Sequence, residues 1–217
     1  MYSYIFLTVL FVSCNADYTA TVRDPICTNR NGYYQSDNSC DSYFECREYQ
    51  ATPMTCPDGL HFNPKTAWPG YACSYPMDVN CEGRGVRQPA QPTASCPHQY
   101  GFFPHPDATP EKCGQYVMCT AGTAFDMLCP QGLAFNPVTS HCDWPDQVPY
   151  CNTNRYLGFQ CPAFADNTQV VNFKYEGNCH YFFSCEKGEA RLLSCDPGFA
   201  FDTGSGQCVN ADLVHCQ

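Results

Sequence analysis

Short segments rich in aromatic and branched residues recur along this chain, and turn-forming residues separate them. Residues 115–129 contain two such segments on either side of Thr120-Ala121-Gly122-Thr123. Residues 180–195 have the same organisation around Glu186-Lys187-Gly188-Glu189. Two strand-like segments joined by a short Gly-containing turn are typical of a β-hairpin. The pattern therefore predicts a hairpin at both places and a chain built mainly from short β-strands.

Turn signals dominate elsewhere, and helix signals are nearly absent. The Asn-Pro pairs at 63–64 and 136–137 predict turns that open the loops after them. With 18 Pro and 15 Gly, the chain has few apolar runs long enough for a large helix or one continuous core. Several small domains therefore fit the pattern better than one large domain.

One longer apolar run lies at residues 5–12, and Ser13-Cys14-Asn15-Ala16 follows it. Small residues at the two positions that a signal peptidase inspects predict cleavage after Ala16, so residues 1–16 are expected to be a secretory signal peptide. The run is far shorter than the roughly 20 apolar residues that a membrane-spanning helix needs. We therefore expect a secreted chain without a membrane partner, in which residues 17–26 form an N-terminal segment.

The cysteines divide the chain into three repeats. Cys accounts for 19 of the 217 residues, a content typical of a disulfide scaffold in a secreted protein. Loss of Cys14 with the signal peptide leaves 18, in three sets of six. Five residues always separate the second and third cysteines of a set, and nine always separate the third and fourth. Gly59, Gly132 and Gly198 follow each fourth cysteine by three places, so we predict a triplicated module.

The expected modules span 27–81, 96–151 and 161–216, with linkers at 82–95 and 152–160. A hydrophobic core alone is marginal at this size, and three disulfides in each module would compensate for it. Six cysteines allow 15 pairings, and the sequence does not choose among them. A flexible linker as long as 82–95 has a root-mean-square reach of about 20 Å. We therefore expect the first and second modules to be semi-independent, and the second and third to lie closer together.

Charge and motif content narrow the function classes. The formal net charge of −10 and the pI near 4.8 argue against a partner held by phosphate neutralisation, so no nucleic acid is expected. The six His residues share no repeat position and form no metal-ligand spacing. The sequence contains no nucleophile or phosphate-loop motif. We expect no catalytic residue, no metal and no cofactor, and therefore no enzyme.

Aromatic residues make up 15% of the chain, a high proportion for domains with so little core to fill. An exposed ring beside polar groups stacks on the apolar face of a sugar, while Asn, Asp and backbone groups bond its hydroxyl or acetamido substituents. Two repeat positions carry such rings. They are three places after the second cysteine (Tyr43, Tyr116 and Phe182) and two places after the fifth (Tyr75, Trp144 and, breaking the pattern, Asn210). These rings predict a carbohydrate ligand.

The alternative is that the rings pack inside the modules. We favour packing against the disulfides for Tyr43, Tyr116 and Phe182, and also for the Phe residues at 62, 135 and 201. For Trp144 we favour exposure.

Several motifs resemble one known family. They are the Cys-x5-Cys-x9-Cys centre of every module, Gly-Phe-Phe-Pro-His at 101–105, Cys-Pro-x-Gly-Leu-x-Phe-Asn at 56–63 and 129–136, and Cys-Asp-Trp-Pro at 142–145. This combination resembles the peritrophin-A type chitin-binding domain, carbohydrate-binding module family 14, over nearly all of the mature chain. Three such domains after a signal peptide are similar to the three-domain arthropod cuticular proteins analogous to peritrophins, the obstructor and Gasp group.

The resemblance implies hevein-like or tachycitin-like modules in which the first cysteine pairs with the third, the second with the sixth and the fourth with the fifth. The implied pairs are Cys27–Cys46, Cys40–Cys81, Cys56–Cys73, Cys96–Cys119, Cys113–Cys151, Cys129–Cys142, Cys161–Cys185, Cys179–Cys216 and Cys195–Cys208. The resemblance also implies chitin, poly-N-acetylglucosamine, as the partner, bound around the fourth and fifth cysteines. Trp144 is the expected sugar platform and Tyr75 its match in the first module. The further candidates are Tyr116, Tyr43, Phe182, Asn136 and Asn63.

Two departures from the repeat affect these expectations. The first module has 16 rather than 12 residues before its fifth cysteine, and the additional residues around Trp68-Pro69-Gly70-Tyr71 are expected to reshape that loop or to supply another ring. The third module has Val209-Asn210 where the second has Asp143-Trp144, which leaves spacing or protein contact as its alternative role.

Our leading hypothesis is a secreted, non-catalytic protein that organises or crosslinks chitin in arthropod cuticle or a related extracellular matrix, with other cuticle matrix proteins as further partners. The peritrophic matrix of the gut is the second location. A disulfide-framed array of protein-interaction or inhibitor modules without carbohydrate binding is the alternative function. The binding part of a chitinase or deacetylase is a third hypothesis, but three modules in 217 residues are expected to leave no room for the catalytic domain.

Overall fold

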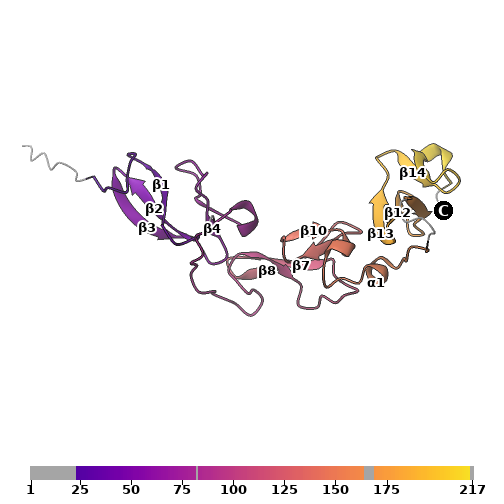
Figure 1. The fold of residues 1–217 in the computed structure, drawn as a ribbon, viewed down its shortest axis with the longest axis horizontal. Helices are drawn as coiled ribbons and strands as arrows, with labels where there is room; N and C mark the ends of the chain where they lie inside the picture. The colour runs from indigo at the N-terminus through magenta and orange to yellow at the C-terminus, as the bar shows by residue number, and fades with distance from the viewer. Residues whose placement is uncertain (1–22, 82, 164–168, 216–217) are drawn as a thin grey trace, which may run out of the picture.

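The computed structural model describes residues 23–81, 83–163 and 169–215. The predicted signal peptide at 1–16 and Cys216 lie outside these residues. Figure 1 shows three modules that follow one another in chain order along a bowed line. The architecture is small, disulfide-rich and mainly β, as predicted. No helix in the described part of the chain has the length and apolar character needed to cross a membrane.

Each module contains a three-stranded antiparallel sheet followed by a two-stranded one. The first module has β1 (Gly32–Gln35), β2 (Ser42–Arg47), β3 (Gln50–Thr55), β4 (His61–Phe62) and β5 (Cys73–Ser74). The second has β6 (Gly101–Pro104), β7 (Gln115–Thr120), β8 (Thr123–Leu128), β9 (Ala134–Asn136) and β10 (His141–Asp143). The third has β11 (Val171–Lys174), β12 (Tyr181–Glu186), β13 (Glu189–Ser194), β14 (Phe199–Asp202) and β15 (Gln207–Asn210).

Both predicted hairpins are confirmed. β7 pairs with β8 and β12 pairs with β13, each antiparallel and in continuous register. The β7–β8 turn places Ala121 at φ 49° and Gly122 at φ 76°. Two consecutive residues with positive φ form the turn whose twist matches a hairpin.

Helices are short and lie at the ends of the modules. Three 3-10 turns follow the two-stranded sheets: η1 (Pro76–Asp78), η2 (Pro145–Gln147) and η3 (Ala211–Leu213). The predicted linker at 152–160 contains the single described α-helix, α1 (Thr153–Leu157). The Asn152 side chain accepts the Arg155 N–H at its start, and Gly158 ends it at φ 66°. An Asn cap and a left-handed Gly are frequent helix limits, so the local sequence explains this one turn of helix.

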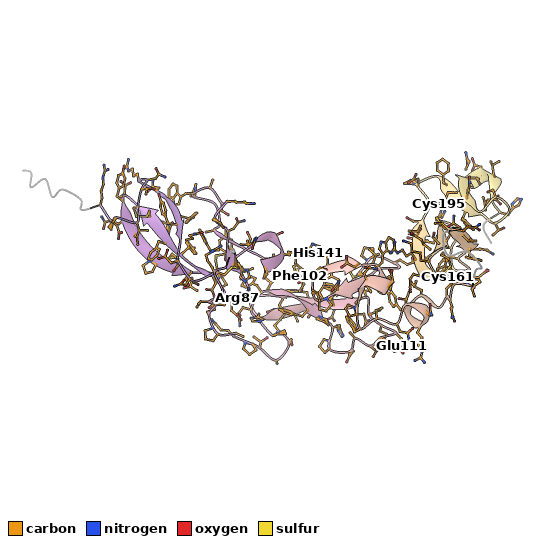
Figure 2. All side chains as sticks on the ribbon, viewed as in Figure 1. Arg87, Phe102, Glu111, His141, Cys161 and Cys195 are labelled. Atoms are coloured by element: carbon orange, nitrogen blue, oxygen red, sulfur yellow. A yellow bond between two sulfur atoms is a disulfide. The ribbon has the colours of Figure 1, made fainter. Side chains whose placement is uncertain are left out.

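Eight disulfides are described, and they join the positions that the family resemblance implies. They are Cys27–Cys46, Cys40–Cys81, Cys56–Cys73, Cys96–Cys119, Cys113–Cys151, Cys129–Cys142, Cys161–Cys185 and Cys195–Cys208. Figure 2 labels Cys161 and Cys195 on the third module. Cys179 is also disulfide-bonded. The first bridge of each module joins the N-terminal loop to the middle strand of the three-stranded sheet. The bridge between the fourth and fifth cysteines joins the end of the three-stranded sheet to the second strand of the two-stranded sheet.

The same Phe forms the centre of each module. Phe62, Phe135 and Phe201 are 0, 1 and 4% exposed, as their predicted packing requires. Each lies on the first strand of its two-stranded sheet and faces the ring of the neighbouring three-stranded sheet. One repeated aromatic pair therefore connects the two sheets of every module.

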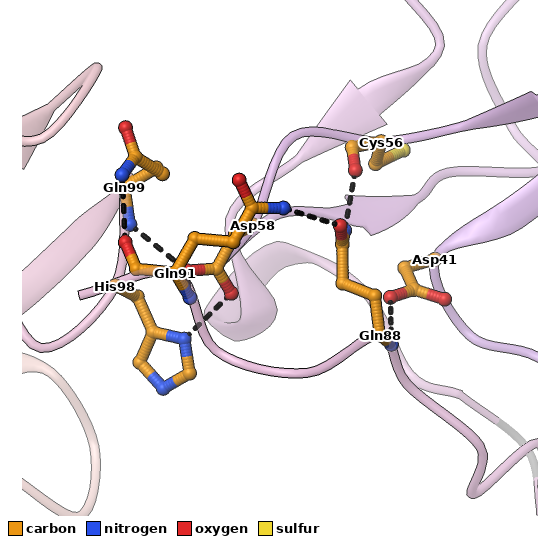
Figure 3. Close-up of polar contacts among 7 residues, drawn as sticks. All are labelled: Asp41, Cys56, Asp58, Gln88, Gln91, His98 and Gln99. Atoms are coloured by element: carbon orange, nitrogen blue, oxygen red, sulfur yellow. Dashed lines mark hydrogen bonds and ion pairs between the residues drawn. The ribbon is translucent and has the colours of Figure 1, made fainter.

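The described part of the linker, residues 83–95, is folded onto the first module, so the prediction of semi-independent first and second modules is wrong. Val86 forms a parallel bridge with Ser39. The Gln88 N–H donates to Asp41 over 2.6 Å, and the Gln91 N–H donates to Asp58 over 2.7 Å (Figure 3). In both hydrogen bonds a side-chain carboxylate of the first module accepts from a backbone N–H of the linker. The composition of the linker indicated flexibility. Composition does not show where the backbone N–H groups of the linker find hydrogen-bond acceptors, so this docking was not predictable from it.

The contact between the first and second modules, joint 1, continues from this linker. The Asp58 carboxylate is buried, lies 2.7 Å from Nδ1 of His98 and accepts the Gln99 N–H (Figure 3). The Tyr100 N–H donates to the Asp58 backbone carbonyl over 3.0 Å. One residue of the first module therefore receives hydrogen bonds from three consecutive residues of the second.

The contact between the second and third modules, joint 2, uses an ion pair. The Arg191 guanidinium meets the Asp146 carboxylate through Nη2 at 3.1 Å and Nε at 3.3 Å. Gln131 Nε2 donates to the Tyr175 hydroxyl over 3.2 Å. A Cβ at Gly132 would lie only 2.8 Å from Leu192, so the backbones approach closely here. The second and third modules are in contact, as the shorter linker predicted.

Candidate functional site

Two rows of side chains cross the same face of each three-stranded sheet. The docking row comprises Tyr33, Glu45 and Thr52 in the first module, Phe102, Met118 and Phe125 in the second, and Asn172, Ser184 and Arg191 in the third. The stacking row comprises Gln35, Tyr43 and Met54, then Pro104, Tyr116 and Met127, then Lys174, Phe182 and Leu193. The rows are neighbours because residues two apart in a strand point to the same face.

The rings at the centre of the stacking row pack against the central Phe residues. Tyr43 on Phe62 and Tyr116 on Phe135 have ring centroids 4.8 Å apart, and Phe182 on Phe201 has 5.0 Å. All three pairs are stacked at 11°. The predicted internal packing occurs, but against a Phe ring rather than chiefly against a disulfide. Offset stacking of this kind stabilises each pair by about 1 kcal/mol beyond burial.

Tyr43 is therefore unsuitable as a sugar contact. It is 8% exposed, and Tyr33 covers it from the other side with an edge-on ring at 5.7 Å. Tyr116 and Phe182 are half-buried and keep part of their surface in the solvent. Of the three hairpin candidates, only these two remain accessible.

The two Asn candidates use their side chains inside the module. Asn136 is 6% exposed, and its amide donates to Asp143 over 2.9 Å while its carbonyl accepts the Val138 N–H. Asn63 donates to Ser74 over 3.1 Å and accepts the Lys65 N–H in the same way. Both form the predicted Asn-Pro turns, because an Asn carbonyl that accepts the N–H two residues on closes such a turn. This burial and pairing leave the Asn136 side chain little surface for the expected sugar contact.

Tyr75 packs against the core of its own module and also lies at joint 1. Its ring is 5.0 Å from that of Phe102, which heads the docking row of the second module. A groove of about 240 Å³ lies here, lined by both rings together with Met77, His98 and Tyr100. Figure 2 labels Phe102 on the central module. Phe102 belongs to the Gly-Phe-Phe-Pro-His motif, but the motif alone assigned it no role.

Trp144 lies at joint 2 in the corresponding way. The Arg191 guanidinium carbon is 5.3 Å from the centre of its ring, a cation–π distance. The ring is half-buried rather than exposed as predicted. A groove of about 470 Å³ lies beside it, lined by Trp144, Leu133 and Gln131 of the second module and by Phe182, Leu193 and Ser194 of the third. Two sugar candidates from different modules therefore face one groove.

Each joint contains one carboxylate with a lowered pKa. Burial raises the pKa of Asp58, but hydrogen bonds from His98, Gln91 and Gln99 outweigh burial and lower it. Burial likewise raises the pKa of Asp146, and hydrogen bonds from Arg191 and Gln147 outweigh it. Both carboxylates are therefore ionised at neutral pH. Sequence spacing gave no sign of either residue, since neither is an aromatic or a cysteine.

The insertion in the first module supplies exposed rings. Trp68 is 38% exposed and Tyr71 is 65% exposed. Trp68 Nε1 donates to Glu45 over 3.3 Å, and the Tyr33 hydroxyl donates to the Gly70 carbonyl over 2.8 Å. Glu45 and Tyr33 both belong to the docking row. The insertion therefore covers that row in the first module, as Tyr75 and Trp144 do in the next two.

One group of residues in the described part of the chain has metal-ligand proximity: Cys40, His61 and Cys81. Cys40 and Cys81 form a disulfide with each other. Disulfide sulfurs are not thiolates, and a thiolate is what a metal site requires. This group therefore does not constitute a metal site.

Comparison with known proteins gives a consistent picture. The family model described as chitin binding Peritrophin-A domain matches residues 27–81, 96–151 and 166–216. Protein obstructor-E of Drosophila melanogaster is 40% identical over 197 residues, which cover 85% of this chain and 78% of that protein. Peritrophin-1 of Anopheles gambiae is 32% identical over 117 residues, which cover 49% of this chain and 71% of that protein.

An enzyme also shows similarity. Probable chitinase 10 of Drosophila melanogaster is 21% identical over 220 residues, covering 81% of this chain. The matched region is only 9% of that protein. The similarity therefore concerns a small part of the enzyme.

Proposed function

Because the chain belongs to the peritrophin-A family of chitin-binding domains, we propose that it is a secreted, non-catalytic protein that organises or crosslinks chitin in an extracellular matrix. The matched domains, at 27–81, 96–151 and 166–216, account for most of the chain. We propose that the third domain begins at Cys161, because Cys161 is disulfide-bonded to Cys185. The similarity to an enzyme covers 9% of that enzyme, which favours a binding role over a catalytic one.

The groove at joint 2 is the observation that carries the proposal. It has about 470 Å³, within the range of about 300–1,000 Å³ in which ligand sites usually fall. Trp144 and Phe182 offer rings to the apolar face of a sugar, and Gln131, Asp143 and Ser194 offer polar groups to its substituents. A neutral polymer suits this surface, because an acidic chain of charge −10 repels polyanions.

Several sites on one chain suit a polymer ligand. Each site is expected to bind weakly alone, but a second site held near the polymer acts at an effective concentration in the millimolar range. The gain in avidity reaches about 10²–10⁴ when the geometry allows both to bind. Contacts at both joints hold the sites in a defined order, which supports a crosslinking or organising role.

Cuticle is the location that we propose, with other cuticle matrix proteins as further partners. The constant gaps of five and nine residues resemble the three-domain cuticular group. The peritrophic matrix is the second location, and the similarity to Peritrophin-1 supports it.

An array of protein-interaction modules is the second candidate function. The third module favours it, because Asn210 replaces the aromatic residue and Leu213 nearby is 77% exposed. An exposed apolar side chain of this size suits a protein contact at least as well as a sugar.

Retention of the oxidised protein on chitin beads tests the proposal, with cellulose beads as the control polymer. We expect retention on chitin, and a loss of about tenfold or more in affinity for the double variant Trp144→Ala, Tyr75→Ala. Phe199→Ala is the matched control, because this ring is 43% exposed and lines neither groove. No retention of the unaltered protein would contradict chitin binding and favour the interaction array.

A further inference from the structure

The aromatic residue after the fifth cysteine contacts the next module in both cases where the chain has one. Tyr75 of the first module lies 5.0 Å from Phe102 of the second. Trp144 of the second module lies 5.3 Å from the guanidinium of Arg191 in the third. Phe102 and Arg191 occupy the same docking row, at its two ends. At both joints the ring therefore contacts the docking row of the next module, although at opposite ends of that row.

The first module covers its docking row with its own insertion. Trp68 donates to Glu45, the central residue of the row, over 3.3 Å. Tyr33, at the end of the row, donates to the backbone of Gly70 in the same insertion. An indole thus lies over the docking row of the first module, supplied from within, where the other two modules receive a ring from their predecessor.

The third module has no aromatic residue at the position two places after its fifth cysteine. Asn210 stands at the position of Tyr75 and Trp144, and its side chain accepts the Asp212 N–H. The repeat glycines agree with this difference. A Cβ at Gly59 or Gly132 would meet the next module within 3 Å, whereas a Cβ at Gly198 would meet no described atom within 4 Å. The two departures from the repeat, the insertion and Asn210, thus lie at opposite ends of one series of contacts.

From this series we propose that the sugar sites are composite, each formed by the sheet face of one module and the ring that covers its docking row. The ring comes from the preceding module in the second and third sites, as Tyr75 and Trp144, and from the insertion in the first, as Trp68. The proposal rests on the chitin-binding function proposed above. It adds that the second and third modules bind β-1,4-linked N-acetylglucosamine only while docked to their neighbour.

The two grooves support this assignment. Both are lined by residues of two modules, so neither exists in a single module. The groove at joint 2 has about 470 Å³ and combines Trp144 with Phe182 and Leu193 of the stacking row. The groove at joint 1 has about 240 Å³. The site at joint 2 is therefore the larger, and it is the better one to test.

The chain has two Trp residues, and they report on different sites. Trp68 belongs to the site of the first module and Trp144 to the site at joint 2. Two indole N–H signals are thus expected in a nitrogen-15 NMR spectrum of the mature chain. Titration with the soluble hexamer of N-acetylglucosamine should shift both signals.

A substitution in the third module separates a composite site from a site within one module. Leu193 lines the groove from the third module, opposite Trp144 of the second. In Leu193→Asp, we expect the sugar response of the Trp144 signal to weaken by about tenfold or more, since a carboxylate then lies in an apolar contact. The Trp68 signal should respond as in the unaltered chain, which shows that the first module and its site are intact.

Met54→Asp is the matched control, because Met54 holds the same stacking-row position in the first module and is 38% exposed. It should weaken the response of Trp68 and leave that of Trp144 unchanged. Leu193→Ala, a milder change, should weaken the Trp144 response in the same direction by a smaller factor.

An unchanged Trp144 response in Leu193→Asp would overturn the composite site. If that chain and the unaltered one are still retained on chitin beads, chitin binding stands and only the composite arrangement fails. If the unaltered chain is not retained and neither indole signal shifts, the proposed function fails and the composite site with it.

Discussion

The two joints connect the same kind of module in the same direction, yet they do so with different chemistry. At joint 1 a buried carboxylate, Asp58, accepts backbone N–H groups from the linker and the second module and also lies against His98. At joint 2 the carboxylate is Asp146, and its partner is the guanidinium of Arg191. Asp58 follows the fourth cysteine of its module, whereas Asp146 follows the fifth of its own.

The comparison shows which feature of a joint is repeated. Gln131 stands at the position of Asp58, and it still contacts the next module through Tyr175. Met77 stands at the position of Asp146 and lines the groove at joint 1. The same two loops therefore make the contact at both joints. The carboxylate comes from the loop after the fourth cysteine at joint 1 and from the loop after the fifth cysteine at joint 2. A carboxylate with directional partners fixes orientation, and either loop can supply it.

Substitution of the repeat glycines should separate the joints most strongly. Gly59, Gly132 and Gly198 have φ of 92°, 86° and 87°, so alanine costs each of them backbone strain of about 1–3 kcal/mol. A Cβ at Gly59 would also lie 2.0 Å from the Tyr100 carbonyl oxygen. We expect Gly59→Ala to open joint 1 and Gly132→Ala to loosen joint 2, while Gly198→Ala opens neither.

Small-angle scattering measures this as a larger radius of gyration, and chemical denaturation measures the strain common to all three. Equal scattering from the three variants would show that the glycines serve only the turns and not the joints.

Removal of the carboxylates should weaken the two joints unequally. Asp58→Asn leaves one acceptor oxygen for three donors, and loss of a buried, hydrogen-bonded charge costs about 2–5 kcal/mol. Asp146→Asn should cost about 1 kcal/mol, because the Arg191 side chain is 31% exposed and water compensates for part of the loss.

Hydrogen exchange of the Gln91 and Gln99 amides measures the first effect directly, since both donate to Asp58. The exchange rates of both amides should rise in Asp58→Asn and stay unchanged in Asp146→Asn. Slow exchange in Asp58→Asn would mean that the linker is held to the first module by Gln88 and Val86 instead.

Acidification should loosen both joints. Near neutral pH this is the smallest of the expected effects. The folded pKa of Asp58 and of Asp146 is lowered below the ordinary value near 3.8. A lowered folded pKa contributes stability that is complete above the unfolded value and is lost as the pH falls through the folded one. Scattering should therefore be constant from pH 7 to about pH 5, and the radius of gyration should rise only below about pH 4. An opening that begins between pH 7 and pH 6 would show that ionisation of these two carboxylates does not hold the joints closed.

Features that repeat inside a module were predictable. The hairpins and the buried Phe residues follow from spacings that recur three times. The fate of individual polar and aromatic residues was not. Asn136 is of a residue type that suits a sugar contact, but it is only 6% exposed. Its side-chain amide bonds instead to Asp143 and within the turn. Trp144 is of a residue type that suits an exposed sugar platform, but it packs with Arg191, 47 positions further along the chain.

The sequence by itself determined the module, because cysteine spacing, turn residues and strand pattern act over short distances and three copies repeat the same constraint. Only the tertiary structure decided how the modules meet. Asp58 meets His98 and Trp144 meets Arg191 through surfaces that are far apart in the chain and have no period. Exposure is a property of what packs next to a residue, and a spacing pattern within one module contains no information about the next module's surface.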